Sequence, residues 1–138
     1  MNDKIVNFTD GDKSIAFAIE HAQETLNVFF NAFLSPQDNQ ESFLLKVKFE
    51  DDQNVEHIWV ADINASTFPL QGTVANETNF PNIKFMQRVE FHPSRITDWM
   101  FIEDGFLVGG YTTQVIRSQL TTQERVDYDA NAPYSFKN

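Results

Sequence analysis

Residues 95–109 have the sequence RITDWMFIEDGFLVG. The apolar run that ends at Glu103 predicts a strand, and residues 106–109 predict a second strand that returns beside it. Asp104-Gly105 between the two runs is a strong hairpin signal, because both positions tolerate a positive φ. This stretch therefore predicts an antiparallel hairpin, and Ile96, Trp99 and Phe101 are its predicted buried side chains.

A second hairpin is predicted closer to the N-terminus. Residues 43–49 form a strand whose side chains alternate from Leu45 onward, with Leu45, Val47 and Phe49 facing inward and Lys46 and Lys48 facing outward. Residues 51–54 (DDQN) have turn chemistry, and residues 55–63 predict the returning strand.

Two weaker strands are predicted between the hairpins. Residues 67–75 are a third candidate, in which Pro69 and Gly72 indicate a sheet edge or a bulge. Residues 88–92 alternate again, and Pro93-Ser94 turns the chain. The strands lie too close in sequence for crossover helices, which excludes a parallel doubly wound sheet.

One long helix is predicted before the strands. Apolar side chains recur at steps of three and four residues and share one helical face: Ile15, Ile19, Ala22, Leu26, Phe29 and Phe33. Asp12 is the predicted N-cap, and Ser35-Pro36 is the predicted end of the helix. We expect this face to pack on the core.

The C-terminal part is predicted to end in a short helix. Residues 111–117 are compatible with helix or strand, whereas Thr121 and Glu124 fit a capping box for a helix that Pro133 ends. The fold class is therefore α+β, with the N-terminal helix packed on a strongly bent antiparallel sheet of five or six strands. We expect residues 1–138 to form a single domain.

The charge of the chain bears on its partners. It has 138 residues, 10 of them basic and 20 acidic, for a formal net charge of −10. This charge repels phosphate backbones and anionic lipids, so neither a nucleic acid nor a membrane is a predicted partner. It favours a basic protein, although plain solubility accounts for the same charge. Residues 1–10 show no export signal, so we expect a cytoplasmic protein.

Few residues indicate chemistry. The chain has no cysteine, no phosphate-binding glycine loop and no Gly-x-Ser-x-Gly motif. His57 and His92 lack the spacing of a metal site, so no metal, cofactor or catalytic set is predicted. Asp62 and Asp98 are carboxylates in apolar strands. We expect Asp98 to accept backbone or Thr97 hydrogen bonds at a strand kink, with general acid–base work as the alternative.

Several strings in the chain are similar to one known family. They are residues 56–60 (EHIWV), 96–100 (ITDWM), 103–105 (EDG), 107–113 (LVGGYTT), 122–125 (TQER) and 133–136 (PYSF). Together they resemble the YegJ-like family of bacterial domains of unknown function, from the first helix to the last residues. The resemblance implies a compact bacterial cytoplasmic domain, found alone or beside repeat modules, and it supplies no catalytic residues.

The chain departs from the pattern of that family in two places. It has Asn76-Glu77-Thr78 where the family has Asn-x-Pro, and Met86-Gln87 where the family has Gly-Asp. Because methionine disfavours the torsions open to glycine, we expect the turn at Met86 to use different torsions.

The first functional interpretation is a non-enzymatic protein-binding domain, most concretely an immunity-type inhibitor that occludes a basic toxin or effector. Its candidate acidic patches are Asp51, Asp52 and Glu56 on one loop, Glu103 and Asp104 on another, and Asp127 and Asp129 near the end. Trp59, Trp99 and Tyr111 are candidates for a groove near Gly109-Gly110, with packing of both tryptophans in the core as the alternative.

Two other interpretations stay open. A small-molecule enzyme or sensor would have a pocket around Asp98, His57 and Trp99. An accessory domain of unknown role would bind another bacterial protein by its sheet edge. The sequence leaves the oligomeric state and the identity of the partner open.

Overall fold

The computed structural model describes residues 12–137, so residues 1–10, in which the sequence shows no export signal, lie outside the described residues. The elements follow in this order: α1 (Lys13–Glu24), α2 (Leu26–Leu34), β1 (Gln40–Glu50), β2 (Val55–Asn64), β3 (Leu70–Val74), β4 (Arg88–Phe91), the 3-10 helix η1 (Pro93–Arg95), β5 (Ile96–Glu103), β6 (Phe106–Gly109), α3 (Tyr111–Ser118) and α4 (Thr122–Asn131). The fold is α+β, as predicted.

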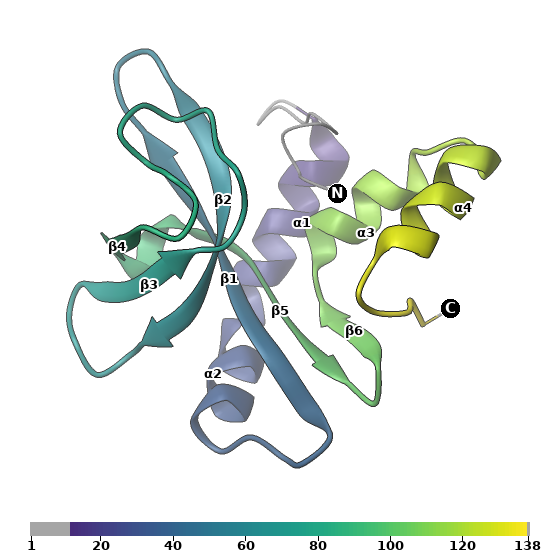
Figure 1. The fold of residues 1–138 in the computed structure, drawn as a ribbon, viewed down its shortest axis with the longest axis horizontal. Coiled ribbons are helices and arrows are strands. Elements are labelled where there is room, and N and C mark those ends of the chain that lie inside the picture. Colours follow the sequence, from purple (N-terminus) through teal and green to yellow (C-terminus); the bar gives the residue numbers. More distant parts are fainter. Residues whose placement is uncertain (1–11, 138) are drawn as a thin grey trace.

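The strands of the described chain form one antiparallel sheet with the order β4-β3-β2-β1-β5-β6. Its registers shift twice between β1 and β5 and once between β2 and β3. Such bulges bend a strand and increase its twist. Figure 1 shows β2, β3 and β4 turned away from β6, with α1 and α2 behind β1 and β5. The prediction of a strongly bent antiparallel sheet is confirmed.

Both predicted hairpins are present. Asp51 closes the β1–β2 turn, since its amide donates to the carbonyl of Asn54 at 2.9 Å and its carboxylate accepts from the amides of Gln53 and Asn54. In the β5–β6 turn, Asp104 and Gly105 have φ angles of 54° and 81°. These are the positive values on which the hairpin prediction rests.

The predicted long helix is divided in two at Thr25. Thr25 has φ −108° and ψ 12°, and its hydroxyl donates back to the carbonyl of His21 at 2.8 Å. A threonine hydroxyl bonded to a carbonyl four residues earlier competes with the helical backbone, which explains the break. Asp12 caps α1 through the amides of Ser14 and Ile15, and α2 ends before Ser35, both as predicted.

The third strand lies inside the sheet, between β2 and β4, so of the two readings of Pro69 and Gly72 the edge is wrong. The register shift that follows Ala61 in β2 fits the other reading, a bulge. Gly72 is required by close packing, because a Cβ there would overlap the side chain of Val60 on the neighbouring strand. β3 tolerates this glycine because β3 is hydrogen-bonded to a strand on each side.

The turn before β4 keeps a glycine-like torsion. Met86 has φ 75°, and its amide donates to the carbonyl of Val74 at 2.8 Å. This is the left-handed region that glycine enters without strain. The expectation that methionine moves this turn to other torsions is therefore wrong, because the hydrogen bond to Val74 holds the backbone in place.

Residues 111–117, left open between helix and strand, belong to α3. Two glycines precede the helix, with φ 77° at Gly109 and 62° at Gly110. A Cβ on Gly109 would overlap the carbonyl and the ring of Trp99, so this position allows the chain to pass close to β5 before α3 begins. The capping box of Thr121 and Glu124 starts α4, as predicted.

Both faces of the sheet carry apolar side chains. On one face, α1 and α2 cover the larger core, which includes Ala22, Phe29, Leu45, Val60 and Trp99. On the other face lies a smaller cluster, built from Met100, Ile102 and Leu107 with Leu44, Trp59, Tyr134 and Phe136 packed on it. None of the helices in residues 12–137 combines the length and the apolar character that crossing a lipid bilayer requires.

Candidate functional site

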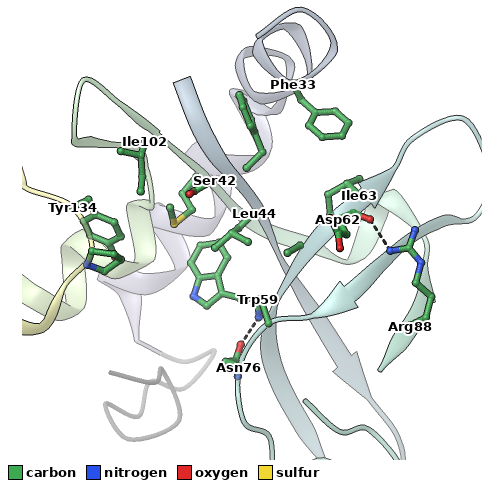
Figure 2. A pocket seen from close by; sticks show the side chains of 15 residues that line it. Phe33, Ser42, Leu44, Trp59, Asp62, Ile63, Asn76, Arg88, Ile102 and Tyr134 are labelled. Carbon is green, nitrogen blue, oxygen red and sulfur yellow. Dashed lines mark hydrogen bonds between the residues drawn. The ribbon is translucent and has the colours of Figure 1, made fainter. Parts of the chain in front are cut away.

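The smaller apolar cluster forms the floor of a groove of about 1000 Å³. Figure 2 shows Trp59 near its centre beside Leu44, with Ile102 and Tyr134 on one side and Asp62, Ile63 and Arg88 on the other. The lining side chains come from α2, β1, β2, β4, β5, the segment after β3 and the chain after α4: Phe33, Ser42, Phe43, Leu44, Trp59, Ala61, Asp62, Ile63, Ala75, Asn76, Arg88, Met100, Ile102, Pro133 and Tyr134.

Trp59 is held in the groove by its own backbone and by a buried cation. Its amide donates to Oδ1 of Asn76 at 2.7 Å, and its carbonyl accepts from the amide of Ala75 at 2.8 Å. On the same face, Nζ of Lys46 lies 4.8 Å from the centre of the indole ring. A cation at this distance from a tryptophan ring is attracted by its π electrons. Trp59 is therefore half-buried and fixed in orientation, with its remaining surface in the groove.

A closed polar cluster lies beside this floor. Lys46 and Asp98 are cross-strand partners on β1 and β5, and both are 0% exposed. Nζ of Lys46 donates to Oγ1 of Thr112 at 2.9 Å, and Oγ1 of Thr112 donates to Asp98 at 2.6 Å. The prediction that Lys46 faces outward into solvent is wrong, because the first turn of α3 covers this face of β1.

Asp98 joins β5 to the start of α3. Its carboxylate accepts from the amides of Trp99, Tyr111 and Thr112, so it supplies the side-chain cap that Gly110 cannot provide. The predicted backbone hydrogen bonds are confirmed, but the hydroxyl comes from Thr112 and not from Thr97. A register shift next to Asp98 matches the predicted kink.

The electrostatics of Asp98 follow from its burial. Burial raises the pKa of the Asp98 carboxyl above its ordinary value, whereas the charge of Lys46 and the hydrogen bonds from Thr112 and Trp99 act in the opposite direction. A buried carboxylate is costly unless it is paired and hydrogen-bonded, and Asp98 has both kinds of partner. The arrangement explains how α3 is fixed to the sheet without exposing a reactive group.

The predicted pocket around Asp98, His57 and Trp99 is not assembled. Asp98 and Trp99 are at most 1% exposed, and Trp99 lies in the larger core, where its Nε1 donates to the carbonyl of Ala22 at 3.2 Å. His57 lines a separate depression, where its Nδ1 lies 3.0 Å from Oγ1 of Thr97. Trp59, Trp99 and Tyr111 likewise do not share a groove, since Tyr111 lines the surface between α1 and α3.

The predicted acidic patches lie at three separate places. Asp51, Asp52 and Glu56 are at the β1–β2 hairpin, Glu103 and Asp104 at the β5–β6 hairpin, and Asp127 and Asp129 on α4. Several take part in local structure: Asp51 closes its turn, Glu56 accepts from the amide of Asn79, Glu103 accepts from Gln40, and Asp129 pairs with Arg117. The structure therefore spreads the acids over the surface and does not gather them around the groove.

Most side chains at the groove were not predicted as site residues, and Lys46 beside it, Asn76, Arg88 and Tyr134 illustrate why. Lys46 gave no signal, because alternation predicts the face of a strand and not what covers it. Asn76 and Arg88 reach the groove by hydrogen bonds to β2 from other parts of the chain. Asn76 accepts from the amide of Trp59, and Arg88 donates to the carbonyl of Asp62 at 2.6 Å. Tyr134 belongs to the PYSF string on which the family resemblance rests, and its side chain lines the groove.

Comparison with known proteins places the chain among bacterial proteins. Residues 12–136 match the family model described as "Uncharacterized protein conserved in bacteria (DUF2314)". The chain is 30% identical over 140 residues to a protein of Neisseria meningitidis serogroup B that is named an ankyrin repeat protein, with 94% of this chain and 55% of the relative covered. It is 24% identical over 113 residues to the uncharacterized protein YegJ of Escherichia coli K12, with 81% and 72% covered. The chain thus spans about half the length of the Neisseria relative. No solved structure matches it.

Proposed function

This chain belongs to the DUF2314 family of bacterial proteins, and we propose that it is a protein-binding domain and not an enzyme. The groove over Trp59 is the surface that receives the partner. This proposal rests on one contrast in the geometry: the open concave surface has aromatic and aliphatic side chains on its floor beside polar ones such as Asp62, Asn76 and Arg88, whereas Asp98 and Lys46 are sealed and hydrogen-bonded. Aromatic and aliphatic side chains in such depressions are the usual centres of binding energy at protein interfaces.

The partner is a basic protein that inserts an apolar side chain into the groove. The formal charge of −10 attracts a cationic protein over a distance and speeds the encounter. Its most concrete form is an immunity-type inhibitor in the bacterial cytoplasm, which occludes a basic toxin or effector. In this mechanism the surface around the groove blocks the partner sterically, and the scattered acidic side chains attract the partner over a distance.

The Neisseria relative is longer than the region that this chain matches, which supports a domain that functions by binding another protein. This chain covers 55% of that protein, so a domain of this kind occurs there inside a longer chain. A domain that acts through its own exposed groove can be joined to other modules without loss of its binding surface.

A pull-down from the native bacterium tests the proposal. The tagged chain is expected to retain a stoichiometric basic protein at low salt and to release it as salt rises, because the Debye length falls. Trp59→Leu is expected to weaken retention of that same partner by about tenfold or more. Phe17→Leu is the matched control, since Phe17 is a 69% exposed aromatic side chain on α1, outside the groove. Equal retention by both variants would contradict the assignment of the groove.

Sheet-edge pairing is a second candidate for the same activity. The outer edge of β6 already carries residues of the C-terminal segment, since the amide of Leu107 donates to the carbonyl of Ser135 and the amide of Ser135 to that of Gly105, both at 2.9 Å. The opposite edge strand is β4. Pairing there would add backbone hydrogen bonds that depend little on salt. Salt-resistant retention that Trp59→Leu leaves intact would favour β4 over the groove.

A further inference from the structure

A helix and the tail that follows it close one end of the groove over Trp59. They are α4 and residues 132–137, here called together the strap, and Figure 1 shows them in yellow on the side of α3 and β6. The tail turns back along β6, where Phe106 and Ser135 form a parallel bridge. Pro133 and Tyr134 from the tail line the groove. One wall of the proposed binding surface therefore comes from the strap.

The tail covers the smaller apolar cluster in the way that a ligand would. Its side chains alternate, so that Tyr134 and Phe136 are half-buried while Pro133, Ser135 and Lys137 are exposed. The two aromatic rings pack on the three central side chains of the cluster, which are at most 7% exposed. These three side chains owe part of their burial to the tail, because Tyr134 and Phe136 lie against them.

The contacts of the strap lie at the surface. None of the residues of α4 is buried. Arg117 on α3 holds both parts of the strap, since it donates to Asp129 through two contacts of 2.7 Å and lies 4.4 Å from the centre of the Phe136 ring. Backbone hydrogen bonds of 2.9 Å join Ser135 to Gly105 and Leu107. Segments with few buried apolar contacts open at a lower free energy than the rest of a protein.

We infer that the strap is a displaceable cover, which opens as a unit while the sheet and the first three helices stay folded. Its release uncovers the smaller apolar cluster and extends the groove. Tyr134 and Phe136 are then internal competitors, whose places are taken by apolar side chains of the partner. The use of the uncovered cluster by a partner rests on the function proposed for the groove, whereas the opening itself does not.

Native-state hydrogen exchange tests the opening. The reporters are the amides of Leu107 and Ser135, which join the tail to β6 and its turn, and the reference is the amide of Gly110, which donates to the carbonyl of Trp99 at 2.7 Å. The two reporters are expected to exchange about a hundredfold or more faster than the reference. Their rates should also depend less on urea, because opening exposes less surface than unfolding. Equal rates with the same urea dependence would overturn the proposal.

Two matched arginine variants test what holds the strap. Arg117→Gln is expected to speed exchange of the Leu107 and Ser135 amides by about tenfold and to leave Gly110 unchanged. Arg95→Gln removes the same charge from an exposed ion pair with Glu50, outside the strap, and should leave all three amides unchanged. An equal effect of the two variants would overturn the role of Arg117.

The pull-down tests the competition with a partner. Arg117→Gln is expected to retain the partner about threefold or more better than the parent, because less free energy is needed to release the strap. Arg95→Gln controls for the lost charge, since both variants make the chain more negative by one unit. Equal retention by the two variants would overturn the competition. If neither variant nor the parent retains a protein, the proposed function fails, and the exchange rates still decide whether the strap opens.

Discussion

Lys46 and Lys48 stand two residues apart on β1 and point to the same face of the sheet, yet their surroundings differ. Lys46 is 0% exposed and donates to Thr112, while Lys48 is half-buried beside His57 in an open depression. The first turn of α3 covers the sheet at Lys46 and leaves it uncovered at Lys48. The comparison teaches that a second layer of structure decides whether a lysine on this strand is enclosed in the fold or lies in an open depression.

The largest expected effect is at Lys46. Lys46→Met would leave the buried Asp98 without its counter-charge, and we expect a loss of about 3–5 kcal/mol in the free energy of unfolding. Lys48→Met is the matched change, with an expected loss of about 1 kcal/mol or less. Urea denaturation measures both. A similar cost for the two lysines would remove the distinction between the two regions.

A double variant separates the charge from the packing. Lys46→Met combined with Asp98→Asn is expected to recover more than half of the stability lost by Lys46→Met alone, since no buried charge is then left unpaired. Asparagine retains an oxygen that can accept from the amide of Thr112. Additive losses in the double variant would show that Lys46 and Asp98 do not act as a pair.

The next effect concerns the glycine that brings α3 over Lys46. Gly109→Ala is expected to cost about 3 kcal/mol, because φ is 77° and the new Cβ would overlap Trp99. Gly105→Ala shares the positive φ but meets nothing within 4 Å, so its expected cost is about 1 kcal/mol. Thermal and urea unfolding of the two variants compare strain alone with strain plus overlap. Equal costs would show that close packing at Gly109 does not matter.

A smaller effect is expected at the hydroxyl that links the two charges. Thr112→Val removes the acceptor for Lys46 and the donor to Asp98, and should cost about 2 kcal/mol. Thr112→Ser keeps the hydroxyl and is expected to cost less. If serine destabilises the protein as much as valine does, the methyl group contributes as much to stability as the hydroxyl, and the link between the two charges is not the main role of Thr112.

The smallest effect is on the surface, where Arg117 holds Asp129 through two contacts of 2.7 Å. The hydrogen bond from Arg117 lowers the pKa of Asp129 below its usual 3.8. A folded-state pKa below the unfolded value gives stability that is present above pH 3.8 and is lost as the pH falls through the folded pKa. Asp129→Asn should therefore be slightly less stable than the parent at pH 7, with the difference vanishing at low pH. A difference that persists in acid would rule out this charge effect.

Much of the fold could be predicted because its signals are local. The hairpins at Asp51 and Asp104, the N-cap at Asp12 and the capping box at Thr121 each depend on residues that are close in sequence. The division of the first helix was missed, because the hydroxyl of Thr25 competes with the backbone in a way that apolar periodicity does not record.

The candidate site was predicted in part. Trp59 was a candidate for a groove near Gly109-Gly110 and instead lines the groove beside Asn76 and Arg88, whereas Asp98 was expected to accept backbone hydrogen bonds and does so. Trp99 and Tyr111 do not line the groove over Trp59, because Trp99 is buried in the larger core and Tyr111 packs against it, with ring centres 5.7 Å apart, while it lines the surface between α1 and α3. The acidic patches were found as sequence features, and the structure distributes them over three places.

Sequence alone determined the types of most elements, residues 111–117 excepted, together with the antiparallel pairing of neighbouring strands and the overall negative charge, since each follows from composition or from residues a few positions apart. Only the tertiary structure decided that Lys46 is enclosed with Asp98 and Thr112, and that Lys48 meets His57 and Arg95. The partners in these sets are separated by up to 66 residues along the chain, as with Lys46 and Thr112. Burial depends on which distant element covers a face, and no local pattern contains that information.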